Sequence, residues 1–278
     1  MLEITDFRDF SISNWYDKFK HISMETIMIE LPDELLKRIQ ADIILADDSE
    51  EESEPELQNQ DSPEPLSAEF VQTFKNAMNR LNNSAFVKNN WHAPIDAKMF
   101  SFGNNLKVSN IEDVILYFTS SGVIQDDFSN IKGIPFCIAL RKWISLHPAA
   151  EFRCIVINNV LRGITPRDWP TYYAHFKEEG PRIIEQLMSF YIENIKITFP
   201  RENYIFDVVF QYPDRPIVVD FGPLNSKTNL YAFSWKEIQP LMGKDVPEDL
   251  PPVFRYLETD IGIMMKADAL NKFAKCHS

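Results

Sequence analysis

The amino-acid sequence predicts an α+β fold, in which separate helices and antiparallel strand pairs share one chain. Apolar residues recur at three- and four-residue spacing over 68–81, the pattern of an amphipathic helix. Two strand-rich stretches follow in the second half, and each is divided by a turn signal: 151–164 by Asn158-Asn159, and 204–221 by Pro213-Asp214. These patterns indicate β-hairpins combined with helices.

Length and composition indicate a globular protein. The chain has 278 residues, 45% of them apolar and 13% aromatic, enough for one sizeable domain or two packed lobes. No apolar run approaches the roughly 20 residues that span a bilayer, and residues 1–10 carry acidic rather than basic residues before any apolar stretch, so we expect no membrane partner. Cys137, Cys154 and Cys276 are too few for a disulfide framework or a four-ligand zinc site, which favours a cytoplasmic location.

The formal charge of -13 is concentrated in one segment. Residues 39–74 hold eleven Asp or Glu and no Lys or Arg, so the rest of the chain is nearly neutral. A dense basic cluster, the usual mark of nucleic-acid binding, is absent, and we expect no nucleic-acid partner. Within the acidic segment, residues 47–65 are predicted to be a disordered insert because they can bury almost no apolar surface. The insert is either a solvated loop or a regulatory segment phosphorylated at Ser49, Ser53 or Ser62.

The other elements are predicted in chain order. A strand at 25–31 ends at Pro32, and a helix at 33–40 follows it. After the helix at 68–81 come a strand at 85–88, a short helix at 111–118, and a strand or strand pair at 136–146. After the first hairpin, a helix should begin at Pro181, because proline suits the first helical turn, and end near 195.

The second hairpin carries one carboxylate in each strand. With a two-residue loop, Asp207 lies directly opposite Asp220 with Cβ atoms about 5 Å apart, and with a four-residue loop the two are diagonal neighbours on the same face. Two like charges among apolar neighbours are unfavourable unless a cation lies between them. Mg²⁺ suits such ligands, since it binds through one or two carboxylates plus phosphates. The alternative is a solvent-facing hairpin edge with Lys or Arg neighbours.

Several cations are candidates for anion binding. Lys88 ends a predicted strand. It is either a phosphate-binding lysine or an ordinary surface lysine, and the sequence alone does not decide between the two. Arg141 and Lys142 stand before Trp143 in an apolar run, where cations gain nothing from burial unless they reach an anion.

Glu151 and Arg153 share one strand face by two-residue alternation, either for a ligand or as an ordinary ion-pair face. Other kinds of site are not indicated by the sequence. The glycines form no phosphate loop, the histidines have no metal-ligand spacing, and no Ser or Cys has a nucleophile context.

Several of these stretches, taken in order, resemble the cell division cycle protein 123 family. The resemblance is carried by 86–97 (FVKNNWHAPIDA), 140–143 (LRKW), 151–154 (EFRC), Arg167-Asp168 and 219–221 (VDF), with Asn14-Trp15-Tyr16 near the N-terminus. It covers nearly the whole chain apart from the acidic insert. The family is similar to ATP-grasp proteins, whose two α+β lobes with antiparallel sheets hold ATP between them. The resemblance therefore implies a single ATP-grasp protein with lobes of about 1–140 and about 141–278.

The resemblance also implies ligands, namely ATP and Mg²⁺. Asp207 and Asp220 would hold the magnesium, and the implied nucleotide-binding residues are Lys88 on the phosphates, Arg141, Lys142 and Trp143 by the adenine, Arg153 and Arg167 facing phosphates, and Glu151 and Asp168 beside them. A strict two-residue turn at 158–159 would put Arg153 and Arg167 on opposite sheet faces. A β-bulge is needed for both to reach one ligand.

One position departs from the ATP-grasp pattern. This chain reads Asp220-Phe221-Gly222-Pro223 where the pattern has Asp-Phe-Asn-Pro, so the usual third metal ligand is missing. Asn225 or water would complete the metal shell.

The family is named for the cell division cycle. The resemblance implies that this chain is an assembly chaperone that acts in translation initiation. It would bind the gamma subunit of eukaryotic translation initiation factor 2 and promote its joining with the alpha and beta subunits. The competing class is an ATP-dependent carboxylate-amine ligase, and a third interpretation is an interaction protein with a decayed nucleotide site. The sequence leaves open whether ATP is hydrolysed.

Overall fold

A computed structural model describes residues 4–47, 65–101, 103, 105–211, 215–243, 247 and 250–260. Within them the chain divides into two compact units. The first contains residues up to Asp17 together with Met24–Ile144, and the second contains Lys18–Ser23 and the residues from Ser145 onward. Apart from its two end residues, the insert predicted at 47–65 lies outside the described residues.

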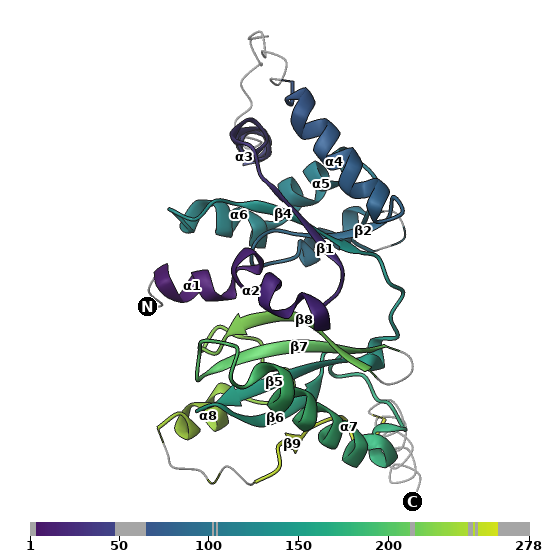
Figure 1. Cartoon of the computed structure of the whole chain (residues 1–278), viewed down its shortest axis with the longest axis vertical. Coiled ribbons are helices and arrows are strands. Elements are labelled where there is room, and N and C mark those ends of the chain that lie inside the picture. The colour runs from purple at the N-terminus through teal and green to yellow at the C-terminus, as the bar shows by residue number, and fades with distance from the viewer. Residues whose placement is uncertain are drawn as a thin grey trace, which may run out of the picture. The chain divides into compact units, whose positions relative to one another are not determined.

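The first unit is built on a four-stranded antiparallel sheet in the order β1-β4-β2-β3. Figure 1 labels β1, β2 and β4 of this sheet. Its strands are β1 (Thr26–Glu30), β2 (Ala85–Lys88), β3 (Lys107–Val108) and β4 (Cys137–Lys142). Side-chain alternation puts Ile29, Val87 and Leu140 on one face, where all three are buried in the core. The strands predicted at 25–31 and 85–88 are confirmed, and the stretch 136–146 forms one strand that ends at Lys142.

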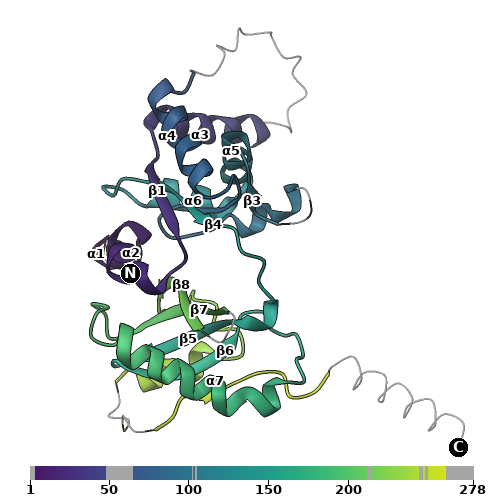
Figure 2. The same ribbon diagram turned by 45° about the vertical axis from the view of Figure 1, so that its right-hand side comes forward.

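Helices cover this apolar face, and Figure 2 shows three of them, α3, α4 and α5, gathered on one side of the sheet. Helix α4 is the predicted amphipathic helix; its Phe70 and Phe74 are buried, and the Ser67 hydroxyl accepts a hydrogen bond from the Phe70 N–H. The helical elements of this unit are α1 (Ile4–Phe10), α3 (Asp33–Asp47), α4 (Ala68–Arg80), η2 (Ile95–Phe100), α5 (Ile111–Ser120) and α6 (Gly122–Asn130), and α2 (Ile12–Phe19) runs into the second unit. Helix α3 extends beyond the predicted end at 40.

The second unit is built on a five-stranded sheet in the order β8-β7-β5-β6-β9. Its elements are η1 (Lys20–Ile22), η3 (Pro148–Ala150), β5 (Glu151–Ile157), β6 (Val160–Pro166), α7 (Phe176–Phe190), the π-helical turn η4 (Tyr191–Ile195), β7 (Tyr204–Gln211), β8 (Arg215–Pro223), α8 (Trp235–Ile238), η5 (Gln239–Leu241) and β9 (Val253–Phe254). All pairs are antiparallel except β6 with β9, which are parallel. The predicted α+β class is thus confirmed, with β9 as an unpredicted parallel addition.

The Asn158-Asn159 turn joins β5 to β6 as predicted. Both residues have positive φ, 52° and 58°, which is the backbone of the type I′ turns that favour asparagine and glycine.

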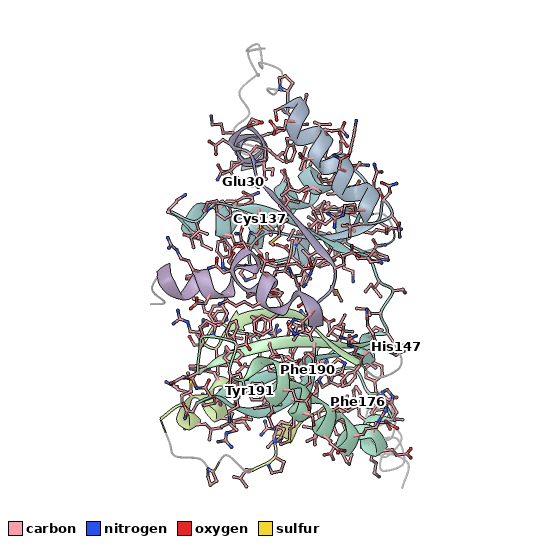
Figure 3. The ribbon with its side chains drawn as sticks, in the orientation of Figure 1. Glu30, Cys137, His147, Phe176, Phe190 and Tyr191 are labelled. Carbon is pink, nitrogen blue, oxygen red and sulfur yellow. The ribbon has the colours of Figure 1, made fainter. Side chains whose placement is uncertain are left out.

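Helix α7 and the turn η4 cover one face of the second sheet through aromatic contacts. The ring of Phe176 lies 5.7 Å from that of Phe152 on β5, and Tyr191 stacks on Phe206 of β7 at 5.9 Å (Figure 3). The prediction that this helix begins at Pro181 is wrong, because it begins at Phe176 and contains Pro181. The buried ring of Phe176 anchors the first turn, so packing overrides the preference of proline for the helix start.

The short segment Lys18–Ser23 belongs to the second unit because its side chains pack there. The Phe19 ring lies 4.9 Å from that of Phe221 on β8, and Ser23 forms a parallel bridge with Val218. Among the described helices, none has the length and apolar character needed to cross a membrane.

Candidate functional site

Two β-bulges bring the charged residues of the second sheet onto one face. On the first hairpin, Ile155 pairs with Gly163 but Val156 pairs with Leu161, so Arg162 is an extra residue. The sequence predicts that a β-bulge is needed in this hairpin for Arg153 and Arg167 to reach one ligand, and the structure has that bulge. Beyond it, the Arg167 N–H donates a hydrogen bond to the carbonyl of Glu151. As a result Arg153 and Arg167 lie on the same face.

The second bulge aligns the two aspartates of the β7–β8 hairpin. Asp207 pairs directly with Asp220, which is one of the two arrangements that the sequence leaves open, but Gln211 pairs with Arg215, so neither the two-residue nor the four-residue loop is formed. The register shifts between Asp207 and Val208, which leaves Val219 as an extra residue on β8. Without this bulge, the pairing of Gln211 with Arg215 would continue and put Asp207 opposite Val219, so the bulge is what places the two aspartates opposite each other.

Asp207 lies at the centre of an ion-pair cluster. Its two carboxylate oxygens accept hydrogen bonds from Nε and Nη2 of Arg153, each at 2.8 Å, and Nε of Arg167 lies 3.4 Å from Oδ2. Arg167 also donates from Nη1 to the carboxylate of Glu151. Asp207 is 4% exposed, so both arginines compensate a charge that has lost most of its hydration.

The electrostatics keep both guanidinium groups charged. Burial lowers the pKa of Arg153, but Asp207 outweighs burial through its charge and hydrogen bonds, and the pKa is raised overall. Burial likewise lowers the pKa of Arg167, while the charges of Asp207 and Glu151 raise it well above its usual value. The cluster therefore carries two permanent positive charges beside three carboxylates, those of Glu151, Asp207 and the neighbouring Asp220.

Two further residues complete the cluster, and sequence reasoning missed both. The ring of Tyr231 lies 4.9 Å from the Arg153 guanidinium, and its hydroxyl accepts from Nε of Arg167 at 3.2 Å. The backbone carbonyl of Asn229 accepts from Nη1 of Arg153. Neither residue belongs to a strand or a recognisable motif, so no signal in the sequence pointed to them.

Asp220 is half-buried, and its Oδ1 accepts a hydrogen bond from the N–H of Phe221 at 3.1 Å. Among the described residues, no group of three His, Cys, Asp or Glu side chains is placed to hold a metal ion. A side chain at Gly222 would meet Ile205 at 3.1 Å, so Ile205 occupies the space beside this position. The Asn225 side-chain oxygen accepts the Lys227 N–H at 2.8 Å and so closes a local turn.

The predicted site residue Asp168 does not take part in the ion-pair cluster around Asp207. Its carboxylate accepts a hydrogen bond from the hydroxyl of Tyr173. Burial, together with this hydrogen bond and the charge of Asp168, raises the pKa of Tyr173 to about 12.

In the first unit, Lys88 and Arg141 share the sheet face opposite the core. Phe86 pairs with Arg141, and two-residue alternation puts Lys88 on the same face; each of the two cations is only 1% exposed. Arg141 lies 6.0 Å from the Trp15 ring and donates to Thr26 at 3.3 Å.

The neighbouring candidates Lys142 and Trp143 are placed differently. Lys142 points to the opposite face of β4 from Arg141, where it lies exposed 3.6 Å from Glu25, and Trp143 follows the end of the strand. The stretch 141–143 therefore does not present its cations together.

The polar residues after Lys88 hold the chain in place. Asn89 accepts the N–H groups of Trp91 and His92 and donates to Asp127, and Asn90 accepts the N–H of Cys137. Cys137 pairs with Glu30 across β1 and β4 (Figure 3), and burial raises the pKa of its thiol to about 12, although the charge of Lys88 acts in the opposite direction. These contacts fix the position of the Lys88 backbone.

Known proteins match this chain over most of its length. The family model described as D123 matches residues 15–275. The translation initiation factor eIF2 assembly protein of Xenopus tropicalis is 31% identical over 90% of this chain and 84% of its own length. The solved structure of Cdc123 from Schizosaccharomyces pombe matches with a TM-score of 0.77 and 25% identity, covering 93% of this chain and 99% of that one.

A more distant likeness is to a RimK domain protein ATP-grasp from Sphaerobacter thermophilus, with a TM-score of 0.41 and 14% identity over 86% of this chain and 66% of that one. That likeness is too low to support an argument about this chain. The family match, by contrast, spans nearly the whole sequence, and the resemblance seen in the motifs is confirmed. The chain belongs to the D123 family.

Proposed function

We propose that this protein promotes assembly of eukaryotic translation initiation factor 2 in the cytoplasm, and that the gamma subunit is its direct partner. The observation that carries the proposal is the match to an eIF2 assembly protein over 90% of this chain and 84% of the relative. ATP with magnesium is proposed as a ligand of the working state. When bound, the metal would neutralise phosphate charge.

The charged cluster of the second unit supports a phosphate ligand. Its two arginines stay protonated, and guanidinium groups suit phosphate oxygens through charge-assisted hydrogen bonds. In the first unit, Lys88 and Arg141 share one buried sheet face, and we propose that this face binds an anion.

The two aspartates fit a magnesium ion by their chemistry. A carboxylate has about four lone-pair positions, so Asp207 can keep its hydrogen bonds with Arg153 and still offer an oxygen. Asp220 lies opposite and offers a second hard oxygen ligand. Phosphate oxygens and water would fill the remaining positions, as is usual for Mg²⁺. Asn225 is not proposed as a ligand, because its oxygen closes a local turn.

The test is to incubate the purified protein with ATP and magnesium, with and without the purified gamma subunit, and to analyse the nucleotide by chromatography. The proposal expects intact ATP that stays bound, and a stable complex with the gamma subunit in a pull-down. Formation of ADP with a new amide product would instead identify a carboxylate-amine ligase. Gamma binding without nucleotide binding would identify an interaction protein.

A further inference from the structure

Tyr231 has a backbone conformation that its residue type rarely adopts. Its φ is +52°, and the other non-glycine residues with positive φ in the described part of the chain are all asparagines. Asparagine tolerates the left-handed region, whereas an aromatic residue there is uncommon and strained by about 1–2 kcal/mol. Such strain persists only where surrounding contacts hold it, and it is enriched at functional sites.

The contacts that hold Tyr231 lie on both sides of it. Leu230 and Phe233 are buried in the apolar cluster of the second unit, and the Tyr231 N–H donates to Oδ1 of Asn229 at 2.9 Å. Between these anchors, the side chain of Tyr231 contacts the guanidinium groups of both arginines.

The two arginines differ in how their nitrogens are used. Arg153 donates from all three, with Nε and Nη2 bonded to Asp207 and Nη1 bonded to Asn229. Arg167 donates from Nη1 to Glu151 and from Nε to Tyr231, while its Nη2 donates to none of the residues the structure describes. Every nitrogen of Arg153 therefore already has a protein partner, whereas both N–H groups of Arg167 Nη2 can point at a ligand.

We propose that Tyr231 is a positioning residue, whose hydroxyl orients Arg167 so that Nη2 faces a phosphate of the bound nucleotide. The inference rests on the ATP binding proposed above and assigns the phosphate contact to Arg167, with Arg153 holding Asp207. A guanidinium has three nitrogens in one plane, so fixing Nη1 at Glu151 and Nε at Tyr231 fixes the direction of Nη2.

The experiment is a double-mutant cycle on ATP affinity, measured by calorimetry in the presence of magnesium. Tyr231→Phe removes the hydroxyl and keeps the ring over Arg153, and should weaken ATP binding about tenfold, the order expected for one hydrogen bond to a charged group. Because the same hydrogen bond is present without ATP, the melting temperature without ATP should fall slightly, while the variant stays folded at the temperature of the affinity measurement. Tyr172→Phe makes the same chemical change at an exposed tyrosine and should leave the affinity unchanged.

In an Arg167→Gln background, Tyr231→Phe should have no further effect, because the hydroxyl acts through Arg167. If Arg167→Gln does not fold, Arg167→Lys serves as the background, and the added effect should be smaller than in the wild type. Wild-type affinity in Tyr231→Phe, or an equal loss in both backgrounds, would overturn the role of Tyr231. A wild-type protein that binds no ATP would overturn the proposed nucleotide binding, and this inference with it.

Discussion

Asp207 accepts hydrogen bonds from Nε and Nη2 of Arg153, one on each carboxylate oxygen and each at 2.8 Å. The pair is nearly buried, with side chains 6% and 11% exposed, and it joins neighbouring strands at the centre of the second sheet. A carboxylate proposed as a metal ligand thus also stabilises the fold. A substitution at Asp207 should therefore change both metal binding and the stability of the fold. A substitution at Asp220, which is half-buried, should change metal binding with a smaller effect on stability.

Asp207→Asn should lower the free energy of unfolding by about 3–5 kcal/mol, because it leaves the positive charges of Arg153 and Arg167 buried without their partner. Urea denaturation followed by tryptophan fluorescence measures the change. Asp220→Asn is the matched control and should lower the free energy of unfolding much less. Equal stability of Asp207→Asn and the wild type would show that the ion pair does not stabilise the fold.

Asp220→Asn should remove most of the stabilisation that ATP and magnesium give. Ligand binding to the folded state contributes about 2.7 kcal/mol at a hundredfold excess over the dissociation constant. The melting temperature with and without the ligands measures it. An ATP-induced shift as large as that of the wild type would contradict the metal role of Asp220.

Asn159→Val should lower the free energy of unfolding by about 1–2 kcal/mol, since the residue has φ of 58° and a β-branched side chain is strained there. Chemical denaturation is the readout. Asn159→Gly keeps the turn and should be nearly neutral, so similar losses in both variants would mean that backbone conformation is not the cause.

Acid should remove the contribution of an exposed ion pair at the end of α8. Hydrogen bonds from Arg255 and then from Ser234 lower the pKa of Glu237 to about 2, from an ordinary value of 4.5. A lowered folded-state pKa gives stability that is present above pH 4.5 and is lost as the pH falls toward 2. Glu237→Gln should therefore be less stable than the wild type at pH 6, and the difference in urea midpoints should narrow below pH 4.5. A difference that is constant with pH would show that the charge of Glu237 is not involved.

Much of the fold could be predicted because its signals are local. The asparagine pair at 158–159 and the spacing of Phe70 and Phe74 each identify one element directly. The start of α7 could not be predicted, because the packing of Phe176 decides it.

The arrangement of the candidate site could be predicted only in part, because sequence periodicity does not reveal where β-bulges lie. A single extra residue such as Arg162 or Val219 leaves no mark on sequence periodicity, yet it decides which side chains share a face. The direct pairing of Asp207 with Asp220 is one of the two arrangements that the sequence left open, and the bulge at Val219 produces it although neither loop length considered is formed. Tyr231 could not be found at all, since its left-handed backbone depends on contacts distant in the sequence.

The most direct test of the proposed function is assembly of the three-subunit factor from purified alpha, beta and gamma subunits with ATP and magnesium. The yield of complete factor, measured by size-exclusion chromatography, should rise when the wild-type protein is added. It should rise much less with Asp220→Asn, although this variant should still bind the gamma subunit. A yield with the wild-type protein no higher than without it would contradict the proposal.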